Sequence, residues 1–64
     1  MIVNGKNIFL EEPISISEFL QINGYLDDRV AVEKNKIIIP RRDFDKEQIT
    51  DKDSLEIVTF VGGG

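Results

Sequence analysis

The residues of this sequence that could do chemistry lie at its C-terminus, where Gly62, Gly63 and Gly64 follow a predicted strand. Glycine adds nothing to packing and costs conformational entropy to order, so three in a row do not serve stability. Without Cβ atoms, an arm of roughly 10 Å could thread a narrow channel in another protein. The α-carboxylate of Gly64, ionised at neutral pH, would be the reactive group. A frayed chain end is the alternative that the tail alone leaves open.

An ionised carboxylate can attack a phosphorus atom, but it must be activated before it can transfer its acyl group. Adenylation by a nucleotide would supply that activation by forming a mixed anhydride. The sequence contains no Gly-rich phosphate-binding loop and no residue spacing typical of a metal site. We therefore expect no cofactor on this chain, and we expect ATP to be used by a separate activating enzyme.

Length and composition exclude most enzyme chemistry. A chain of 64 residues forms one domain without a deep catalytic cleft. The absence of Cys and His removes thiolate nucleophiles, the usual zinc ligands and the usual general base. The net charge of −4 disfavours nucleic acid and anionic membranes, and no apolar run is long enough to span a bilayer. These properties predict a cytoplasmic protein that is not an enzyme and is monomeric when free.

The element best defined by local sequence is a hairpin at the start of the chain. Residues 1–3 and 6–10 are short strand-like runs, and Asn4-Gly5 favours a two-residue turn with positive φ at both positions. Further strands are predicted at residues 30–32, 37–39 and 55–61, with turns at 34–35 and 51–53.

A short helix is predicted to begin after Ser15, which stands three residues before Glu18, the spacing of a capping box. Asn23-Gly24 supplies a left-handed stop. A helix of about two turns is unstable alone, so it must pack on the sheet. The apolar residues expected at helical spacing are Ile16, Phe19, Leu20 and Ile22.

The order hairpin, helix, hairpin, irregular connection and strand predicts an α+β fold in two layers, with a mixed sheet of four to five strands packed on one short helix. The polar connection over residues 41–50 would be pinned by Phe44 and Ile49. We expect the domain to span residues 1–61 and the glycine tail to span residues 62–64.

These features together resemble the ubiquitin-like β-grasp sulfur carriers, and most closely the small sulfur carriers of thiamine thiazole biosynthesis. The likeness covers essentially the whole chain. It rests on Asn4-Gly5, residues 15–20 (Ser-Ile-Ser-Glu-Phe-Leu), Val30-Ala31-Val32, Ile39-Pro40-Arg41, residues 55–58 (Leu-Glu-Ile-Val) and the closing glycines. Lys52 departs from the family, which usually has glycine between two acidic turn residues, and Gly62 extends the usual glycine pair.

The resemblance implies a β-grasp fold and a carrier that partner enzymes act upon. Gly64 would be adenylated by an adenylyltransferase related to the ubiquitin-activating enzymes and then converted to a thiocarboxylate. Thiazole synthase would receive the sulfur, and a cysteine desulfurase or related relay would supply it. Gly62 and Gly63 would thread the tail into these partners.

Strand alternation also predicts a docking surface. It places Val58 and Phe60 on the open face of the sheet and Leu55, Ile57 and Val61 under the helix. An exposed apolar patch is a candidate docking surface, to which an arginine could add a salt-sensitive contact. The docking residues that we predict are Ile2, Ala31, Val58, Phe60 and Arg41.

Each of these features has a plainer interpretation. Residues 41–50 could cover the patch, and the pair Arg41-Arg42 could be a solvated surface feature. The acidic clusters lack the spacing of a calcium loop, so we expect no metal site. Two other functions also stay open: a molybdopterin-type sulfur carrier, which is usually longer, and a non-covalent ubiquitin-like interaction module with an inert tail.

Overall fold

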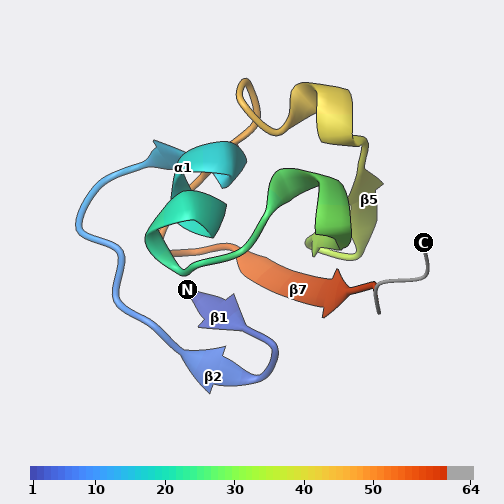
Figure 1. The fold of residues 1–64 in the computed structure, drawn as a ribbon. Coiled ribbons are helices and arrows are strands. Elements are labelled where there is room, and N and C mark those ends of the chain that lie inside the picture. Colours follow the sequence, from blue (N-terminus) through green and yellow to red (C-terminus); the bar gives the residue numbers. More distant parts are fainter. Residues whose placement is uncertain (61–64) are drawn as a thin grey trace.

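The computed structural model describes residues 1–60, which form a five-stranded mixed sheet with one α-helix across one of its faces (Figure 1). The strands of this sheet are β1 (Ile2–Val3), β2 (Lys6–Asn7), β4 (Val30–Lys34), β5 (Ile37–Ile39) and β7 (Ser54–Thr59). The other elements are β3 (Ile14–Ser15), α1 (Ile16–Ile22), η1 (Asp27–Arg29), η2 (Arg41–Asp43) and β6 (Gln48–Ile49). The strand order is β2-β1-β7-β4-β5; β1 and β7 are parallel and the other neighbours antiparallel. The predicted α+β fold is confirmed.

The opening hairpin turns where the sequence predicts, but its second strand, predicted over residues 6–10, ends at Asn7, and the Leu10 N–H donates to Asp51 instead of to a strand. Asn4 and Gly5 have φ of 51° and 83°, and the strands pair Ile2 with Asn7. The Asn4 side chain also prolongs the β1–β7 pairing. Its Oδ1 accepts from the Ile57 N–H at 2.7 Å, and its Nδ2 donates to the Ile57 carbonyl at 3.1 Å. Asn4 therefore sets the turn and also fixes the strand that leads to the C-terminus.

Helix α1 begins and ends where predicted. The Ser15 hydroxyl accepts from the Glu18 N–H at 3.0 Å, and Gly24 follows the Asn23 cap with φ of 80°. The prediction for Ile22 was wrong, because its side chain is 70% exposed. It lies two residues beyond the buried Leu20, about 200° further round the helix, and faces solvent.

The second hairpin turns one residue later than predicted. Lys34 ends β4 and pairs with Ile37, so the turn is Asn35-Lys36, with φ of 52° and 70°. The Asn35 side chain holds this position: its Oδ1 accepts from the Ser54 N–H at 3.0 Å and its Nδ2 donates to Asp53 at 2.9 Å. Asparagine tolerates the left-handed conformation, whereas Lys36 adopts it under strain.

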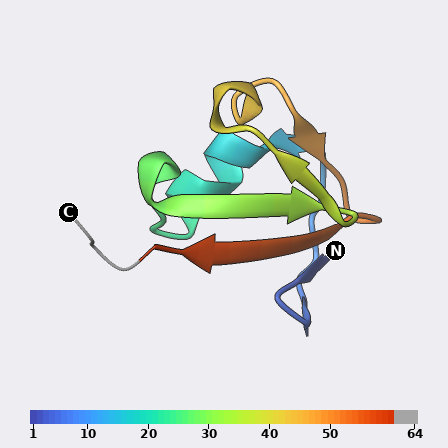
Figure 2. The same ribbon diagram turned by 90° about the vertical axis from the view of Figure 1, so that its right-hand side faces the viewer.

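The core lies between the sheet and the layer of α1, η2 and the β3–β6 pair, all on one side of the sheet (Figure 2). Phe44 and Ile49 are 2% and 0% exposed, so they pin the connection as predicted. The core residues are Met1, Val3, Ile16, Phe19, Leu20, Val30, Val32, Phe44, Ile49, Leu55 and Ile57. Over residues 1–60, no helix is long and apolar enough to cross a membrane.

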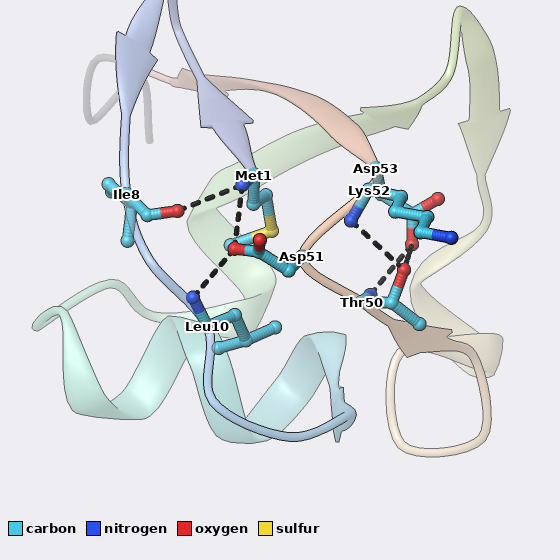
Figure 3. Close-up of polar contacts among 7 residues, drawn as sticks. All are labelled: Met1, Ile8, Leu10, Thr50, Asp51, Lys52 and Asp53. Carbon is cyan, nitrogen blue, oxygen red and sulfur yellow. Dashed lines mark hydrogen bonds and ion pairs between the residues drawn. The ribbon is translucent and has the colours of Figure 1, made fainter.

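The turn before β7 needs no glycine at Lys52. Lys52 is not among the residues with positive φ, and its N–H donates to the Thr50 hydroxyl at 3.2 Å (Figure 3). The Asp53 carboxylate accepts from the Thr50 N–H at 2.7 Å. Asp51 joins this turn to the chain start, because its Oδ1 accepts from the Met1 ammonium at 3.0 Å and from the Leu10 N–H at 2.9 Å (Figure 3). Local hydrogen bonds thus hold this turn in a backbone conformation that does not require glycine.

Candidate functional site

Strand β7 carries the chain toward its C-terminus from the middle of the sheet, between β1 and β4. The Phe60 N–H donates to the Arg29 carbonyl at 2.8 Å, which extends the β4–β7 pairing one residue beyond the strand. The backbone is therefore held on the sheet as far as Phe60. Residues 61–64 lie outside the described residues. They include Val61, the predicted domain boundary at residue 61, the predicted threading residues Gly62 and Gly63, and the predicted attachment residue Gly64.

Three of the predicted docking residues gather beside this exit. Val58 and Phe60 are 57% and 56% exposed, on the face opposite the helix, and Ala31 lies directly across from Val58 on β4. Leu55 and Ile57 are buried on the other face, as strand alternation predicts. Residues 41–50 leave Val58 and Phe60 exposed, since Phe44 and Ile49 turn into the core. We call this group of residues, Val58, Phe60 and Ala31, the exit patch.

Ile2 lies apart from the exit patch. It is 44% exposed and pairs with Ser54, at the start of β7. Val58 follows four residues later, a separation of about 13 Å along the strand. Strand alternation predicts on which face of the sheet a residue lies, but not which residues lie beside it on that face. The sequence alone therefore could not show that Ile2 lies away from the exit patch.

Arg41 is exposed in η2, directly after β5 and Pro40. Because β5 runs antiparallel to β4, its end lies near the start of β4, at the same end of the sheet as Phe60. Sequence reasoning missed a second cation there, Arg29, which is exposed and whose carbonyl accepts the Phe60 N–H. Only the β4–β7 register brings Arg29 to the exit, and no local signal in the sequence gives that register.

Two acidic residues border the exit patch. Glu33 and Glu56 lie directly opposite each other on β4 and β7. The ion pairs among residues 1–60 are Met1–Asp51 and Lys34–Glu47, so neither glutamate has a cationic partner there. Like charges directly opposite each other destabilise a sheet. Sequence reasoning missed this pair, because it too follows from register.

The two carboxyl groups with shifted pKa values lie at the other end of β7. The hydrogen bond from the Leu10 N–H and the contact with the Met1 ammonium lower the pKa of Asp51 from its usual 3.8. Burial acts to raise the pKa of Asp53, but hydrogen bonds from Asn35 and Thr50 and the nearby Lys34 lower it overall. Both carboxylates hold the turn of Figure 3, so we assign them to structure.

Comparison with known families identifies the chain. The family model for the ThiS family matches residues 1–64. The chain belongs to the ThiS family. It is 33% identical over 63 residues to the "Sulfur carrier protein ThiS" of Bacillus subtilis (strain 168), covering 97% of this chain and 96% of that protein. The crystal structure of a thiamine biosynthesis protein (ThiS) from Geobacter metallireducens matches with a TM-score of 0.83 and 32% identity, covering 98% of this chain and 96% of that one.

Longer proteins contain a region similar to ThiS. A thiazole synthase of Paramagnetospirillum magneticum (strain ATCC 700264 / AMB-1) is 33% identical over 64 residues, which are all of this chain and 20% of that protein. The matches confirm the predicted family and the β-grasp fold. The chain is a ThiS-family sulfur carrier of thiamine biosynthesis, and it is not an enzyme.

Proposed function

We propose that this ThiS-family protein carries sulfur as a thiocarboxylate on Gly64. The observation that carries the proposal is the position of β7, whose backbone is paired up to Phe60, four residues before the terminal carboxylate. A chain end that leaves a central strand, paired with β4 along its whole length, is presented at a fixed point of a rigid body. Three glycines beyond that point give reach without side chains, which suits entry into the active site of a partner.

The chemistry belongs to partner enzymes. In the proposed sequence, the Gly64 carboxylate attacks the α-phosphorus of ATP on an adenylyltransferase related to the ubiquitin-activating enzymes, releasing pyrophosphate. A cysteine desulfurase or related relay supplies the sulfur as a persulfide, whose terminal sulfur attacks the acyl adenylate and displaces AMP. A thiol reductant then cleaves the resulting acyl disulfide, which leaves the thiocarboxylate and converts the thiols to a disulfide. The product is a thiocarboxylate tied to one protein. This chain contributes the carboxylate, the arm and the docking surface.

We further propose that the exit patch docks the partner while the tail enters its active site. Exposed aromatic and apolar residues beside the reactive end suit such a role, since aromatic residues are enriched at interfaces. Thiazole synthase is the proposed sulfur acceptor. The similarity of this chain to one part of a thiazole synthase supports this choice, because it links the two activities in one protein.

An intact-mass experiment tests the proposal. The protein is incubated with the adenylyltransferase, ATP and a sulfur source. We expect a species heavier by the difference between one sulfur and one oxygen atom. The control is a chain with one alanine added after Gly64, which keeps the fold and removes the reactive position. An unmodified mass for the native chain, or the same mass gain in the untrimmed extended chain, would refute the proposal.

A second incubation chooses the acceptor. The thiocarboxylate form is offered separately to thiazole synthase and to the large subunit of molybdopterin synthase. We expect loss of sulfur only with thiazole synthase. Transfer only to the molybdopterin enzyme would favour the other carrier pathway.

A further inference from the structure

Strand β5 forms one free edge of the sheet. Within residues 1–60, β4 is the only strand that pairs with it. Its sequence is three isoleucines, and Ile37 and Ile38 are 66% and 71% exposed. A free, apolar edge strand is a ready template for another strand, and proteins normally shield such an edge.

The register shows which backbone groups of β5 are free. The Asn35 N–H donates to the Ser54 carbonyl at 2.7 Å, so the backbone of Asn35 faces β7. Backbone groups alternate along a strand, so those of Glu33 also face β7 and those of Lys34 face β5. Ile38 stands opposite Glu33 and receives no ladder bond from β4. Its N–H and C=O therefore point outward, away from the sheet.

The edge also carries a charge opposite to that of the chain. Residues 34–42 contain four of the eight basic residues and none of the twelve acidic ones. The remaining residues therefore hold twelve acidic and four basic residues. The Lys34 ammonium is engaged by Glu47 at 2.8 Å. Lys36, Arg41 and Arg42 are exposed and form no ion pair among residues 1–60.

These cations stand at both ends of the edge, Lys36 before Ile37 and the arginines after Pro40. If a second copy paired antiparallel at this edge, each Lys36 would come near the arginines of the other copy. Like charges in register destabilise such a pair, so the edge disfavours self-association. The same cations attract a strand whose ends are acidic.

We propose that β5 is a docking edge for an extended segment of a partner protein, apolar in its centre and acidic at its ends. The segment adds a sixth strand beside Ile37–Ile39. Its backbone pairs with the outward N–H and C=O of Ile38, its apolar side chains cover the isoleucines, and its carboxylates meet Lys36 and Arg42. This interaction uses neither Gly64 nor the exit patch.

The test uses a synthetic probe, acetyl-Glu-Glu-Val-Val-Val-Asp-Asp-amide, titrated into the ¹⁵N-labelled protein and followed by NMR. We expect the largest amide shifts at residues 37–39 and slower hydrogen exchange of the Ile38 N–H. The probe with lysine at every acidic position is the charge control and should bind weakly. N-methylation removes a backbone N–H of the probe. Methylating the alternate probe residues whose N–H groups face β5 should weaken binding at least about tenfold, whereas methylating the residues between them should weaken it much less, as strand pairing requires.

Variants of the protein test the charges. The double variant Lys36→Glu, Arg42→Glu should weaken probe binding about fivefold at low salt. The matched double variant Lys6→Glu, Lys46→Glu makes the same charge change outside the edge and should bind nearly as the native chain. Both should form the thiocarboxylate normally, so failure here is distinguishable from failure of the proposed function.

Three results would overturn the proposal. The probe could shift Val58 and Phe60 in place of residues 37–39. The two sets of N-methylated probes, methylated at the residues facing β5 or at the residues between them, could bind equally weakly. A Lys36→Ser, Arg42→Ser variant, which removes the cations, could self-associate while the native chain ignores the probe, which would make the cations only a shield against aggregation.

Discussion

Glu33 and Glu56 face each other across β4 and β7 on the open side of the sheet, beside the exit patch. Two carboxylates in directly opposed positions repel each other, and no cation within residues 1–60 forms an ion pair with either one. The sheet tolerates the repulsion because both side chains reach solvent. A partner that brings a cation to this face would relieve it.

Replacing Glu56→Lys should turn the repulsion into attraction and raise the free energy of unfolding by about 0.5 to 1 kcal/mol. Urea denaturation at low salt measures this gain. Glu56→Gln, which only removes the repulsion, should give a smaller gain, and salt should shrink both. A destabilised Glu56→Lys variant would show that the two carboxylates do not repel each other as the register indicates.

Phe60→Asp should separate docking from folding. Phe60 is 56% exposed, so the free energy of unfolding should change by no more than about 0.5 kcal/mol. The rate of thiocarboxylate formation at low enzyme concentration should fall about tenfold or more, because an apolar contact is replaced by a charge. Phe9→Asp is the matched control, since Phe9 is 79% exposed and lies outside the exit patch. Unfolding of Phe60→Asp would place Phe60 in the core and refute the docking role.

Gly63→Val tests the glycine arm. A branched side chain near the reactive carboxylate should obstruct passage through a narrow channel and lower the rate of adenylation at least about tenfold. Binding to the activating enzyme, measured separately by calorimetry, should change much less, because the exit patch is intact. Adenylation at the native rate would show that the channel does not require glycine at this position.

Features that depend on residues close together in the sequence were predicted correctly, and features that depend on residues far apart in the sequence were not. The Asn4-Gly5 turn and the Ser15 cap were predicted because each is decided within a few residues. The β3–β6 pair was missed, since strands of two residues carry no periodic pattern. The face of Val58 was predicted from alternation, whereas its distance from Ile2 needed the β1–β7 register, which joins residues far apart in the sequence.

Asp51 should make stability depend on pH in the acid range. Its pKa is below its usual 3.8 in the folded protein, so the folded state favours the charged form. The contribution is therefore complete above about pH 4 and is lost as the pH falls through the folded-state pKa. Asp51→Asn should destabilise the protein at pH 6, and the difference from the native chain in urea denaturation should shrink below pH 4. A difference that stays constant with pH would show that ionisation of Asp51 does not contribute to stability, against the lowered pKa.

Lys36 and Asn35 form one turn, and replacing each with glycine should change the free energy of unfolding in opposite directions. Lys36 has φ of 70°, and a left-handed conformation costs a side-chain-bearing residue about 1 kcal/mol, so Lys36→Gly should raise the free energy of unfolding by up to that amount. Asn35→Gly gains the same freedom but loses the hydrogen bonds to Asp53 and Ser54, so it should lower stability by about 1 kcal/mol. Thermal and urea unfolding of both variants measure the two signs. If both substitutions stabilised the protein, the Asn35 side chain would contribute nothing to the turn, and its position would be decided by backbone conformation alone.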